Sequence, residues 1–397
     1  MLTAVSTVTN GGQQGKQTRL GQDGGPGDRR LLVVSHPAIV SVNQEVYREL
    51  GRRGWQLTLL VPQRWRHSFA QEAIEPQALV GLEGSLRALP VAFPGRPQRY
   101  VFLRRPHTEI SRARPDVAFI EEEPFALAST QWGFAFRRLG VPFGVQAYEN
   151  IDRSLPAPVR MLRARVLRDA AFVAARSQTA GELARSWGAR GEIGLAPPAV
   201  PAWPAQPQAP AGRPFTVGYA GRLVESKGLF DLLAAVRTLP APVRLVLIGN
   251  GELRARLEGQ EIPGGSVEVV DGLRHEQMAE GYGRVDVVVL PSHTTPTWKE
   301  QFGRVIVEAL WCGVPVVGSD SGEIPWLIGL TEGGLVFPEG DSGALAERLR
   351  RLREQPPLRR ELATRGRAAV ERLFSVPAAT DAFEALLVAA AGARRSV

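Results

Sequence analysis

The residues that could do chemistry gather first in a glycine-containing turn. Gly221 and Arg222 follow a short apolar run that predicts a strand. Lys227 comes five residues after Arg222, just before residues 229–237, whose spacing predicts a helix. At such a turn the free backbone N–H groups and the helix dipole attract anions, and two cations at this spacing suit a diphosphate. The turn matches neither the Gly-Lys-Ser/Thr phosphate loop nor the Gly-x-Gly-x-x-Gly fingerprint, so a surface turn with two solvated cations is the alternative.

A second candidate segment carries two carboxylates eight residues apart, Glu300 and Glu308. A helix is predicted from about Phe302, so Glu300 lies on the preceding loop and Glu308 about two turns inside the helix. Carboxylates accept paired hydrogen bonds from vicinal hydroxyls, so two at different depths could hold two polyols, such as a ribose and a hexose. A solvated helix residue is the alternative for Glu308, but its neighbours are apolar, and an unpaired buried carboxylate is costly.

Together these segments resemble glycosyltransferase family 4 (group 1), the retaining nucleotide-sugar enzymes with the GT-B fold. The resemblance rests on Gly-Arg-(x)4-Lys-Gly at 221–228 and Glu-(x)7-Glu at 300–308, and it continues through residues 312–320, 322–325 and 334–338. It covers most of residues 215–340 with the spacing intact. Several motifs in the expected structural context make it specific.

The resemblance implies a role for each matched residue. Arg222 and Lys227 would hold the donor diphosphate and Glu300 the transferred sugar, and these three are the expected catalytic residues. The two cations would neutralise the leaving phosphates in place of a metal ion, so neither a metal nor a cofactor is expected. Glu308 would bind the ribose hydroxyls. The other substrate-binding residues expected in this half are Gly221, Ser292, the amides of Gln301, Phe302 and Gly303, and, beside the nucleobase, Asn250 and Gly272.

The amino-terminal half resembles the family less closely. A polar segment that includes His36 and Asn43 replaces the glycine-rich first loop, and both side chains could approach donor phosphates or acceptor. The histidine usual after the fifth strand is missing, and Glu149 in that neighbourhood could orient an acceptor hydroxyl. The alternatives are a structural hydrogen bond for His36 and an ordinary loop carboxylate for Glu149. One of the three glutamates at 121–123 could line the acceptor pocket, with a charged turn as the other interpretation.

Alternating strands and helices must position these residues. Apolar runs at 31–35, 55–61, 117–120, 143–146 and 171–174 predict strands with helices between them, and the alternation restarts after the proline-rich residues 196–210. This pattern predicts an α/β protein with two Rossmann-like domains facing a cleft. The expected division is a disordered start (1–29), an acceptor-binding domain (30–195), a linker (196–214), a nucleotide-sugar-binding domain (215–372) and a carboxyl-terminal helix that packs back on the first domain (373–397).

The composition limits the class of partner. The chain has 397 residues, 44% of them hydrophobic, and a formal net charge of +8. Only three of its 48 basic residues are lysines, and an arginine excess favours phosphates, carboxylates or anionic surfaces. The net charge is +9 over 1–200, −5 over 201–350 and +4 over 351–397, so the excess belongs to the acceptor half and the tail. No recognised reader motif accompanies it, so a nucleic-acid partner is not expected.

Two further features bear on location. A single cysteine, Cys312, allows no internal disulfide and fits a reducing compartment, and no apolar stretch is long enough to cross a membrane. The predicted helix over 159–168 places Arg160, Arg163 and Arg168 beside apolar residues and could lie on an anionic membrane surface, with a solvated helix face as the alternative. Trp65, between two arginines, adds to the case for surface contact.

We therefore expect a cytoplasmic, retaining glycosyltransferase of the hexosyltransferase type, with peripheral contact on the inner face of the plasma membrane. It would move a sugar from a UDP- or GDP-type donor to a hydroxyl acceptor, for which a lipid-linked molecule is the preferred candidate. Glycolipid, cell-envelope or exopolysaccharide synthesis is the expected setting. A nucleotide-sugar epimerase of the same fold and a non-catalytic nucleotide-sugar-binding protein are the alternatives.

Overall fold

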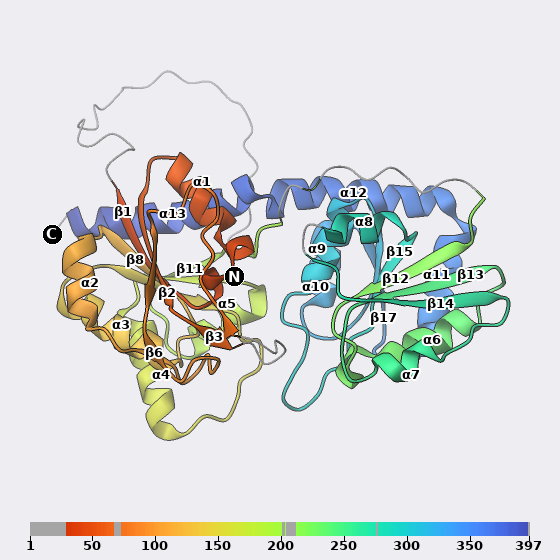
Figure 1. Ribbon diagram of the computed structural model, residues 1–397, viewed down its shortest axis with the longest axis horizontal. Coiled ribbons are helices and arrows are strands. Elements are labelled where there is room, and N and C mark those ends of the chain that lie inside the picture. The colour runs from red at the N-terminus through yellow and green to blue at the C-terminus, as the bar shows by residue number, and fades with distance from the viewer. Residues whose placement is uncertain (1–28, 67–72, 201–202, 204–211, 275–276, 396–397) are drawn as a thin grey trace, which may run out of the picture.

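Two parallel β-sheets, each covered by helices, make up the protein (Figure 1). The computed structural model describes residues 29–66, 73–200, 203, 212–274 and 277–395. Nearly all of the expected disordered start and most of the expected linker lie outside these residues. The α/β class and the two Rossmann-like domains predicted from the alternation are confirmed.

The first sheet has seven parallel strands in the order β11-β10-β9-β8-β1-β2-β5. Their bounds are β1 (Arg30–Ser35), β2 (Gln56–Pro62), β5 (Leu86–Leu89), β8 (Val117–Glu121), β9 (Phe143–Ala147), β10 (Phe172–Ala175) and β11 (Glu192–Leu195). The helices are η2 (Pro37–Ile39), η3 (Ser41–Gln44), α1 (Glu45–Arg52), α2 (Pro106–Ala113), α3 (Leu127–Arg138), α4 (Ala157–Asp169) and α5 (Gln178–Ser186). Two small antiparallel pairs complete the domain: β3 (Trp65–Arg66) with β4 (Ala73–Ile74), and β6 (Val91–Ala92) with β7 (Val101–Phe102).

The second sheet has six parallel strands in the order β14-β13-β12-β15-β16-β17. Their bounds are β12 (Phe215–Ala220), β13 (Val243–Ile248), β14 (Gly265–Val270), β15 (Val287–Leu290), β16 (Val316–Ser319) and β17 (Gly334–Phe337). The helices are η4 (Glu225–Lys227), α6 (Leu229–Arg237), α7 (Arg254–Glu258), α8 (Met278–Gly283), α9 (Arg304–Trp311), α10 (Ile324–Thr331), α11 (Ser342–Glu354), α12 (Pro356–Phe374) and α13 (Val376–Arg395).

Both sheets are buried on their two faces, which is why their strands are runs of apolar residues. Side chains of successive strand residues point to opposite faces, so Leu32 and Val34 of β1 join one core cluster, while Leu31 and Val33 join another. β13 divides in the same way between two clusters of the second domain. The parallel strands of each sheet end at one edge, where loops carry the candidate site residues.

The chain returns to the first domain through its last helix. In Figure 1, α12 and α13 follow one another from the second domain across to the first. Phe383 of α13 packs edge-on against Phe119 of β8, with ring centroids 4.7 Å apart. Arg53 at the end of α1 donates to Glu384 of α13 at 2.8 Å. The last helix is therefore part of the core of the first domain.

The described residues of the linker are held at this crossing point. The backbone N–H of Val200 donates to the carbonyl of Phe374 at 2.7 Å, where α12 ends. The indole N–H of Trp311 donates to the carbonyl of Trp203 at 3.1 Å. Among the described residues, no helix combines the length and apolar character that crossing a membrane requires.

Candidate functional site

The glycine turn after β12 packs against the next strand-end loop through backbone alone. Gly221 and Gly249 have φ angles of 146° and 149°, and a Cβ on Gly249 would lie 1.9 Å from the carbonyl oxygen of Gly221. The N–H of Leu223 donates to the carbonyl of Asn250 at 2.9 Å. Only glycine permits this approach, so the two loops form one surface at the edge of the sheet.

A third loop joins this surface from the end of β15. Gly228 has a φ of 62°, and a Cβ there would lie 2.0 Å from the carbonyl oxygen of Pro291. The N–H of His293 donates to the carbonyl of Ser226 at 2.9 Å. These contacts fix the segment that carries Lys227 against the segment that leads to Glu300.

Lys227 and Glu300, 73 positions apart in the sequence, form an ion pair. Lys227 Nζ lies 2.6 Å from Glu300 Oε2, and the hydroxyl of Ser292 donates to the same oxygen at 2.9 Å. The two charged side chains are only 12% and 13% exposed. The ammonium also lies 4.4 Å from the ring centroid of Trp298, within the range of a cation–π contact. Three residues that the sequence assigned to one site are thus in direct contact.

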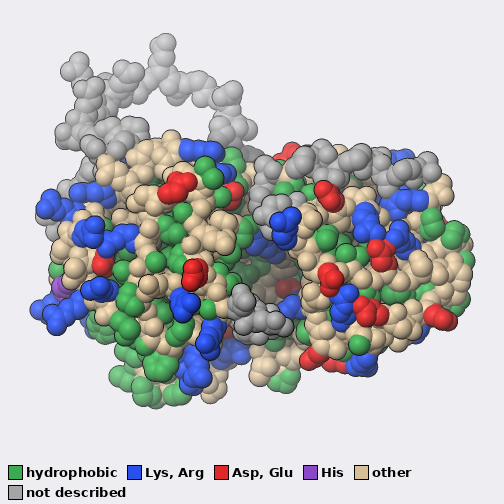
Figure 2. Space-filling model, viewed as in Figure 1, with side chains coloured by type: hydrophobic (Ala, Val, Ile, Leu, Met, Phe, Trp, Pro, Cys, Tyr) green, Lys and Arg blue, Asp and Glu red, His purple; other side chains and the backbone are tan. Residues whose placement is uncertain are grey.

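The first domain contacts this cluster. The side-chain amide of Asn150 donates to the carbonyl oxygen of Glu300 at 2.8 Å. Burial raises the pKa of Glu323, and Thr179, Asn150 and Ser177 of the first domain oppose that shift. The loop of Glu300 therefore lies where the two domains meet, and the surface in Figure 2 is hollowed between them.

Glu308 lies apart from the Lys227–Glu300 pair, inside α9. Glu308 is 6% exposed, and its carboxylate accepts the hydroxyl of Tyr282 at 2.8 Å and pairs with Arg304 at 3.0 Å. Burial raises the pKa of Glu308, and Arg304 and Tyr282 oppose that shift. The apolar neighbours read from the sequence correctly indicated burial; the ribose contact stays a prediction.

The other candidates of the second domain lie around these loops. Arg222 is exposed, and its carbonyl accepts the hydroxyl of Tyr219 at 2.7 Å. Asn250 accepts from Arg254 at 2.8 Å, and a Cβ on Gly272 would lie 3.7 Å from the Asn250 amide, so these two loops are neighbours. Gln301 is partly buried, Phe302 is buried against Phe374, and Gly303 adopts a left-handed conformation with a φ of 73° at the start of α9.

In the first domain, His36 is held by a buried glutamate that directly follows β8. Its Nδ1 lies 2.6 Å from Glu122 Oε2, and its backbone N–H donates to Glu122 Oε1 at 2.7 Å. The imidazole lies 4.6 Å from the ring of Trp65, centroid to centroid. Trp65 is 2% exposed, so the expectation that it contacts a membrane surface is wrong: it belongs to the core beneath His36.

Asn43 and Glu149 are engaged within their own loops. The amide of Asn43 donates to the carbonyl of Pro37 at 2.9 Å. Glu149 accepts the backbone N–H groups of Asn150 and Ile151 and lies 2.6 Å from the Nε of Arg153. Both side chains have structural hydrogen bonds, and contact with a substrate remains a prediction for each.

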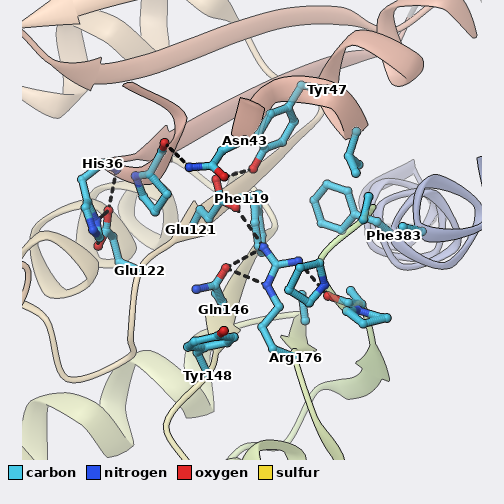
Figure 3. A pocket seen from close by; sticks show the side chains of 18 of the residues that line it. His36, Asn43, Tyr47, Phe119, Glu121, Glu122, Gln146, Tyr148, Arg176 and Phe383 are labelled. Carbon is cyan, nitrogen blue, oxygen red and sulfur yellow. Dashed lines mark hydrogen bonds and ion pairs between the residues drawn. The ribbon is translucent and has the colours of Figure 1, made fainter. Parts of the chain in front are cut away.

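A cavity of about 390 Å³ opens at the carboxyl ends of the first sheet's central strands (Figure 3). Glutamates 121, 122 and 123 all line it, and Glu121 and Glu122 are only 6% and 2% exposed, so the charged-turn interpretation is wrong. Arg176 crosses the cavity wall and pairs with Glu121 at 2.9 Å. Arg304 of the second domain also lines the cavity, as do Ala379 and Phe383 of α13.

Several residues that line the cavity are not predicted from the sequence, namely Tyr47, Gln146, Tyr148 and Arg176. Gln146 and Arg176 stand at or just after the ends of β9 and β10, and strand-end position is the signal that could have found them. Tyr47 lies on α1 and donates to Glu121 at 2.7 Å, a contact that no local pattern predicts.

Glu123 has the most unusual carboxyl of this cavity. Its Oε1 accepts the backbone N–H groups of Tyr148 and Glu149 at 2.8 and 3.0 Å. Its Oε2 is buried and has no hydrogen-bond partner in the described part of the chain. Burial, with the charges of Glu149 and Glu122, raises the pKa of Glu123 from 4.5 to about 8. The carboxyl is therefore mostly protonated at neutral pH.

The basic helix expected to meet a membrane is α4. Arg163 is 7% exposed and stacks on Trp187, 4.0 Å from the ring centroid, so it does not belong to a surface face. Arg160 and Arg168 are exposed. Figure 2 shows basic side chains gathered over the first domain on this face. Within the described ranges, no group of three or more His, Cys, Asp or Glu side chains could hold a metal ion.

Comparisons with known proteins agree with this architecture. A family model described as glycosyl transferases group 1 matches residues 203–369. The capsular polysaccharide biosynthesis glycosyltransferase CapM of Staphylococcus aureus is 29% identical over 167 residues, which are 41% of this chain and 42% of CapM. The lipopolysaccharide core biosynthesis glycosyltransferase LpsD of Rhizobium meliloti is 32% identical over 187 residues, 47% of this chain and 52% of LpsD. The match therefore spans about half the length of these relatives.

Solved structures match over nearly the whole chain. Sucrose-phosphate synthase from Thermosynechococcus elongatus superposes with a TM-score of 0.66 at 21% identity, covering 90% of this chain and 98% of that one. Anabaena HepE in complex with UDP superposes with a TM-score of 0.66 at 18% identity, covering 91% and 99%. The protein thus has the GT-B fold of glycosyltransferases, and its second domain is similar in sequence to the group 1 glycosyltransferases.

Proposed function

We propose that the protein is a retaining glycosyltransferase that moves a sugar from a nucleoside diphosphate sugar to a hydroxyl acceptor. The observation that carries this proposal is the contact of Lys227, Glu300 and Ser292 at the carboxyl ends of β12 and β15. In open α/β sheets this edge is where ligands bind. The similarity to group 1 glycosyltransferases over residues 203–369 supports the same reaction class.

On the donor side, Arg222 and Lys227 would hold the diphosphate. A lysine ammonium has three N–H donors, so the bond to Glu300 leaves others for phosphate oxygens. Both side-chain bonds to Glu300 end on Oε2, and Oε1 would accept hydroxyls of the transferred sugar. The amides of residues 301–303 would assist at the start of α9, and Glu308 would bind the ribose.

In the transfer, the bond from the anomeric carbon to the phosphate oxygen breaks as the bond to the acceptor oxygen forms on the same face of the sugar. The acceptor proton passes to the leaving diphosphate, so no cofactor and no metal is required. Two fixed cations stabilise the charge that develops on the leaving phosphates. Domain closure would exclude water from the reaction.

The acceptor would bind to the first domain, in the cavity beside His36. The relatives CapM and LpsD are named for capsular polysaccharide and lipopolysaccharide core biosynthesis. We infer a cytoplasmic enzyme of the hexosyltransferase type in cell-envelope or exopolysaccharide synthesis, with peripheral membrane contact through the basic first domain. Co-sedimentation with anionic vesicles that weakens as salt rises would support this contact, and binding to neutral vesicles alone would contradict it.

Purified protein incubated with labelled UDP- and GDP-sugars and a membrane extract tests the reaction. Release of nucleoside diphosphate with the label in an extract component is the expected result. An epimeric nucleotide sugar would instead indicate the epimerase, and binding without turnover would indicate a non-catalytic binding protein.

A further inference from the structure

A second cavity lies in the second domain, at the amino ends of its strands. Its volume is about 380 Å³, in the range of small-molecule sites. Most of the residues that line it directly precede β12, β15 and β16 or belong to α12. The loops of Lys227 and Glu300 follow the opposite ends of β12 and β15, and the six residues of β12 alone span about 20 Å. The cavity is therefore separate from the proposed donor site.

Positive charge dominates the lining of this cavity, which includes four arginines: Arg213, Arg359, Arg360 and Arg367. Among the described residues that line it, Asp286 is the one carboxylate. Its Oδ2 lies 3.2 Å from Arg213 Nη1, and its Oδ1 lies 3.8 Å from Arg359 Nη2. One carboxylate therefore faces two guanidinium groups, and four arginines against one aspartate leave an excess of three positive charges.

Two of the arginines stand on one face of α12 with nitrogens available to a ligand. Positions 360, 363, 364 and 367 all line the cavity, a spacing that places them on the same side of a helix. Ala363 and Thr364 are small and leave room between the two arginines. Arg367 donates through Nε to Glu371 at 2.9 Å, which leaves its two terminal nitrogens. Arg360 is exposed, and no described carboxylate lies within ion-pair distance of it.

The same arginines are unfavourable for α12 by itself. Arg359 and Arg360 lie about one turn from its start, and its first turn has no acidic residue. The helix dipole makes the potential positive there, so cations near a helix N-terminus destabilise the helix. Arg359 is compensated by Asp286 and by the carbonyl of Leu352, which accepts from Nη1 at 3.1 Å. Arg360 has no such partner, and an anion in the cavity would supply one.

The wall opposite α12 is uncharged. It consists of residues 312–315, from the end of α9 to the start of β16. Burial raises the pKa of Cys312 to about 12, so this thiol adds no negative charge at neutral pH. Val314 and Pro315 are buried. An apolar wall lowers the local dielectric constant and so strengthens the attraction between the arginines and an anion.

Phosphate is the anion that this arrangement suits. A guanidinium group offers parallel N–H donors that match two oxygens of one phosphate, and arginine is the usual residue where such recognition matters. We propose that this cavity is a second anion-binding site, which takes a free small molecule that carries phosphate and holds it through Arg360 and Arg367. A recess of this volume accommodates a whole small ligand. A lipid head group carries the same phosphate, so the test must separate the two sources.

Titration of inorganic pyrophosphate into the full chain, followed by calorimetry, tests the proposal. The Lys227→Ala variant is the background, because the cation assigned to the donor diphosphate is then absent and binding in the second cavity dominates. We expect one pyrophosphate to bind per chain with a Kd below about 1 mM. The affinity should fall as salt rises. Absence of binding in that range would overturn the proposal.

Variants made in the same background place the binding in this cavity. Arg360→Ala and Arg367→Ala should each weaken pyrophosphate about tenfold or more, because each removes charge-assisted hydrogen bonds. Ala363→Trp fills the space between the two arginines and should abolish binding with every charge intact. The matched control is Arg237→Ala, an exposed arginine on α6 of the same domain. Its affinity should stay within about twofold of the background, because salt screens a distant exposed charge. Equal losses in the control and the cavity variants would refute the site.

Vesicles distinguish a lipid head group from a free ligand. The full chain and its Arg360→Ala variant are sedimented with vesicles of phosphatidic acid in phosphatidylcholine, and with phosphatidylcholine alone. We expect the two proteins to sediment to the same extent with each vesicle. Loss of sedimentation in Arg360→Ala, together with no binding of pyrophosphate, would assign the cavity to lipid and overturn the proposal. Both assays measure binding directly, so their outcome does not depend on whether the protein transfers a sugar.

Discussion

Replacing Lys227 by alanine separates the catalytic from the structural role of the Lys227–Glu300 ion pair. The ammonium supplies one of the two cations assigned to the leaving diphosphate. Removal of a single group that stabilises transition-state charge costs about 10²–10³ in kcat. We expect a loss of this size in kcat/KM for the donor, measured by release of nucleoside diphosphate.

The same substitution has a stability cost that can be worked from the structure. It leaves the Glu300 carboxylate, 13% exposed, with the Ser292 hydroxyl as its remaining side-chain partner. Loss of one partner from a mostly buried charged acceptor costs about 1–3 kcal/mol. Because this cost arises from the charge on Glu300, adding Glu300→Gln to Lys227→Ala should restore the melting temperature.

Activity should not return in that double variant, because the diphosphate still lacks its cation. The matched control is Arg237→Ala, which removes an exposed cation from α6 of the same domain. Donor kcat/KM within about threefold of wild type in Lys227→Ala would refute the diphosphate assignment. Recovery of activity together with stability in the double variant would show that Lys227 acts only by neutralising Glu300.

Four further changes test other parts of the account. Glu308→Gln should keep the melting temperature, because the glutamine amide oxygen still accepts the hydroxyl of Tyr282. It should raise the donor KM about tenfold, because a neutral amide binds ribose hydroxyls less well than a carboxylate does. An unchanged donor KM would exclude the ribose role. Gly249→Ala should lower the free energy of unfolding by about 2 kcal/mol or more, because its Cβ would lie 1.9 Å from a carbonyl oxygen. Gly272→Ala should not lower it, because the nearest atom to a Cβ there is 3.7 Å away. Equal melting temperatures for the two variants would contradict the loop packing. Phe383→Ala should cost about 3–5 kcal/mol in chemical denaturation of the first domain, and a near-native result would show that the last helix is not part of that core. Because the pKa of Glu123 is raised from 4.5 to about 8, the favourable contribution of this carboxyl to folding is complete below pH 4.5 and is lost as the pH rises to about 8. The melting temperature of Glu123→Gln should therefore rise relative to that of the wild type as the pH increases across that range. A constant difference between the two melting temperatures would contradict the burial of this carboxyl.

The spacing of the sequence motifs predicts the donor side of the site better than the acceptor side. Arg222, Lys227 and Glu300 were assigned to one site from two segments far apart in sequence, and the structure joins Lys227 to Glu300 directly. The burial of Glu308 followed from its apolar neighbours. Its partner Tyr282 could not be predicted, because that contact depends on how α8 packs beside α9 rather than on any local pattern.

In the first domain, the local sequence does not indicate which side chains are buried. Trp65 between two arginines reads as a surface residue, yet the fold buries it under His36, since tertiary packing decides burial for an aromatic side chain. Arg163 has helical spacing with exposed arginines but stacks on Trp187, which directly follows α5. Short or partly exposed elements were also missed, among them β5 and β11 at the edges of the first sheet, where few buried positions leave no clear alternation.

The anomeric configuration of the product tests the central claim most directly. Purified protein is given the donor that releases nucleoside diphosphate, and the new glycosidic linkage is assigned from its anomeric proton in the NMR spectrum. We expect a product with the same anomeric configuration as the donor sugar. An inverted linkage would contradict same-face transfer, and failure of every UDP- and GDP-sugar to give a linked product would contradict the proposed glycosyltransferase itself.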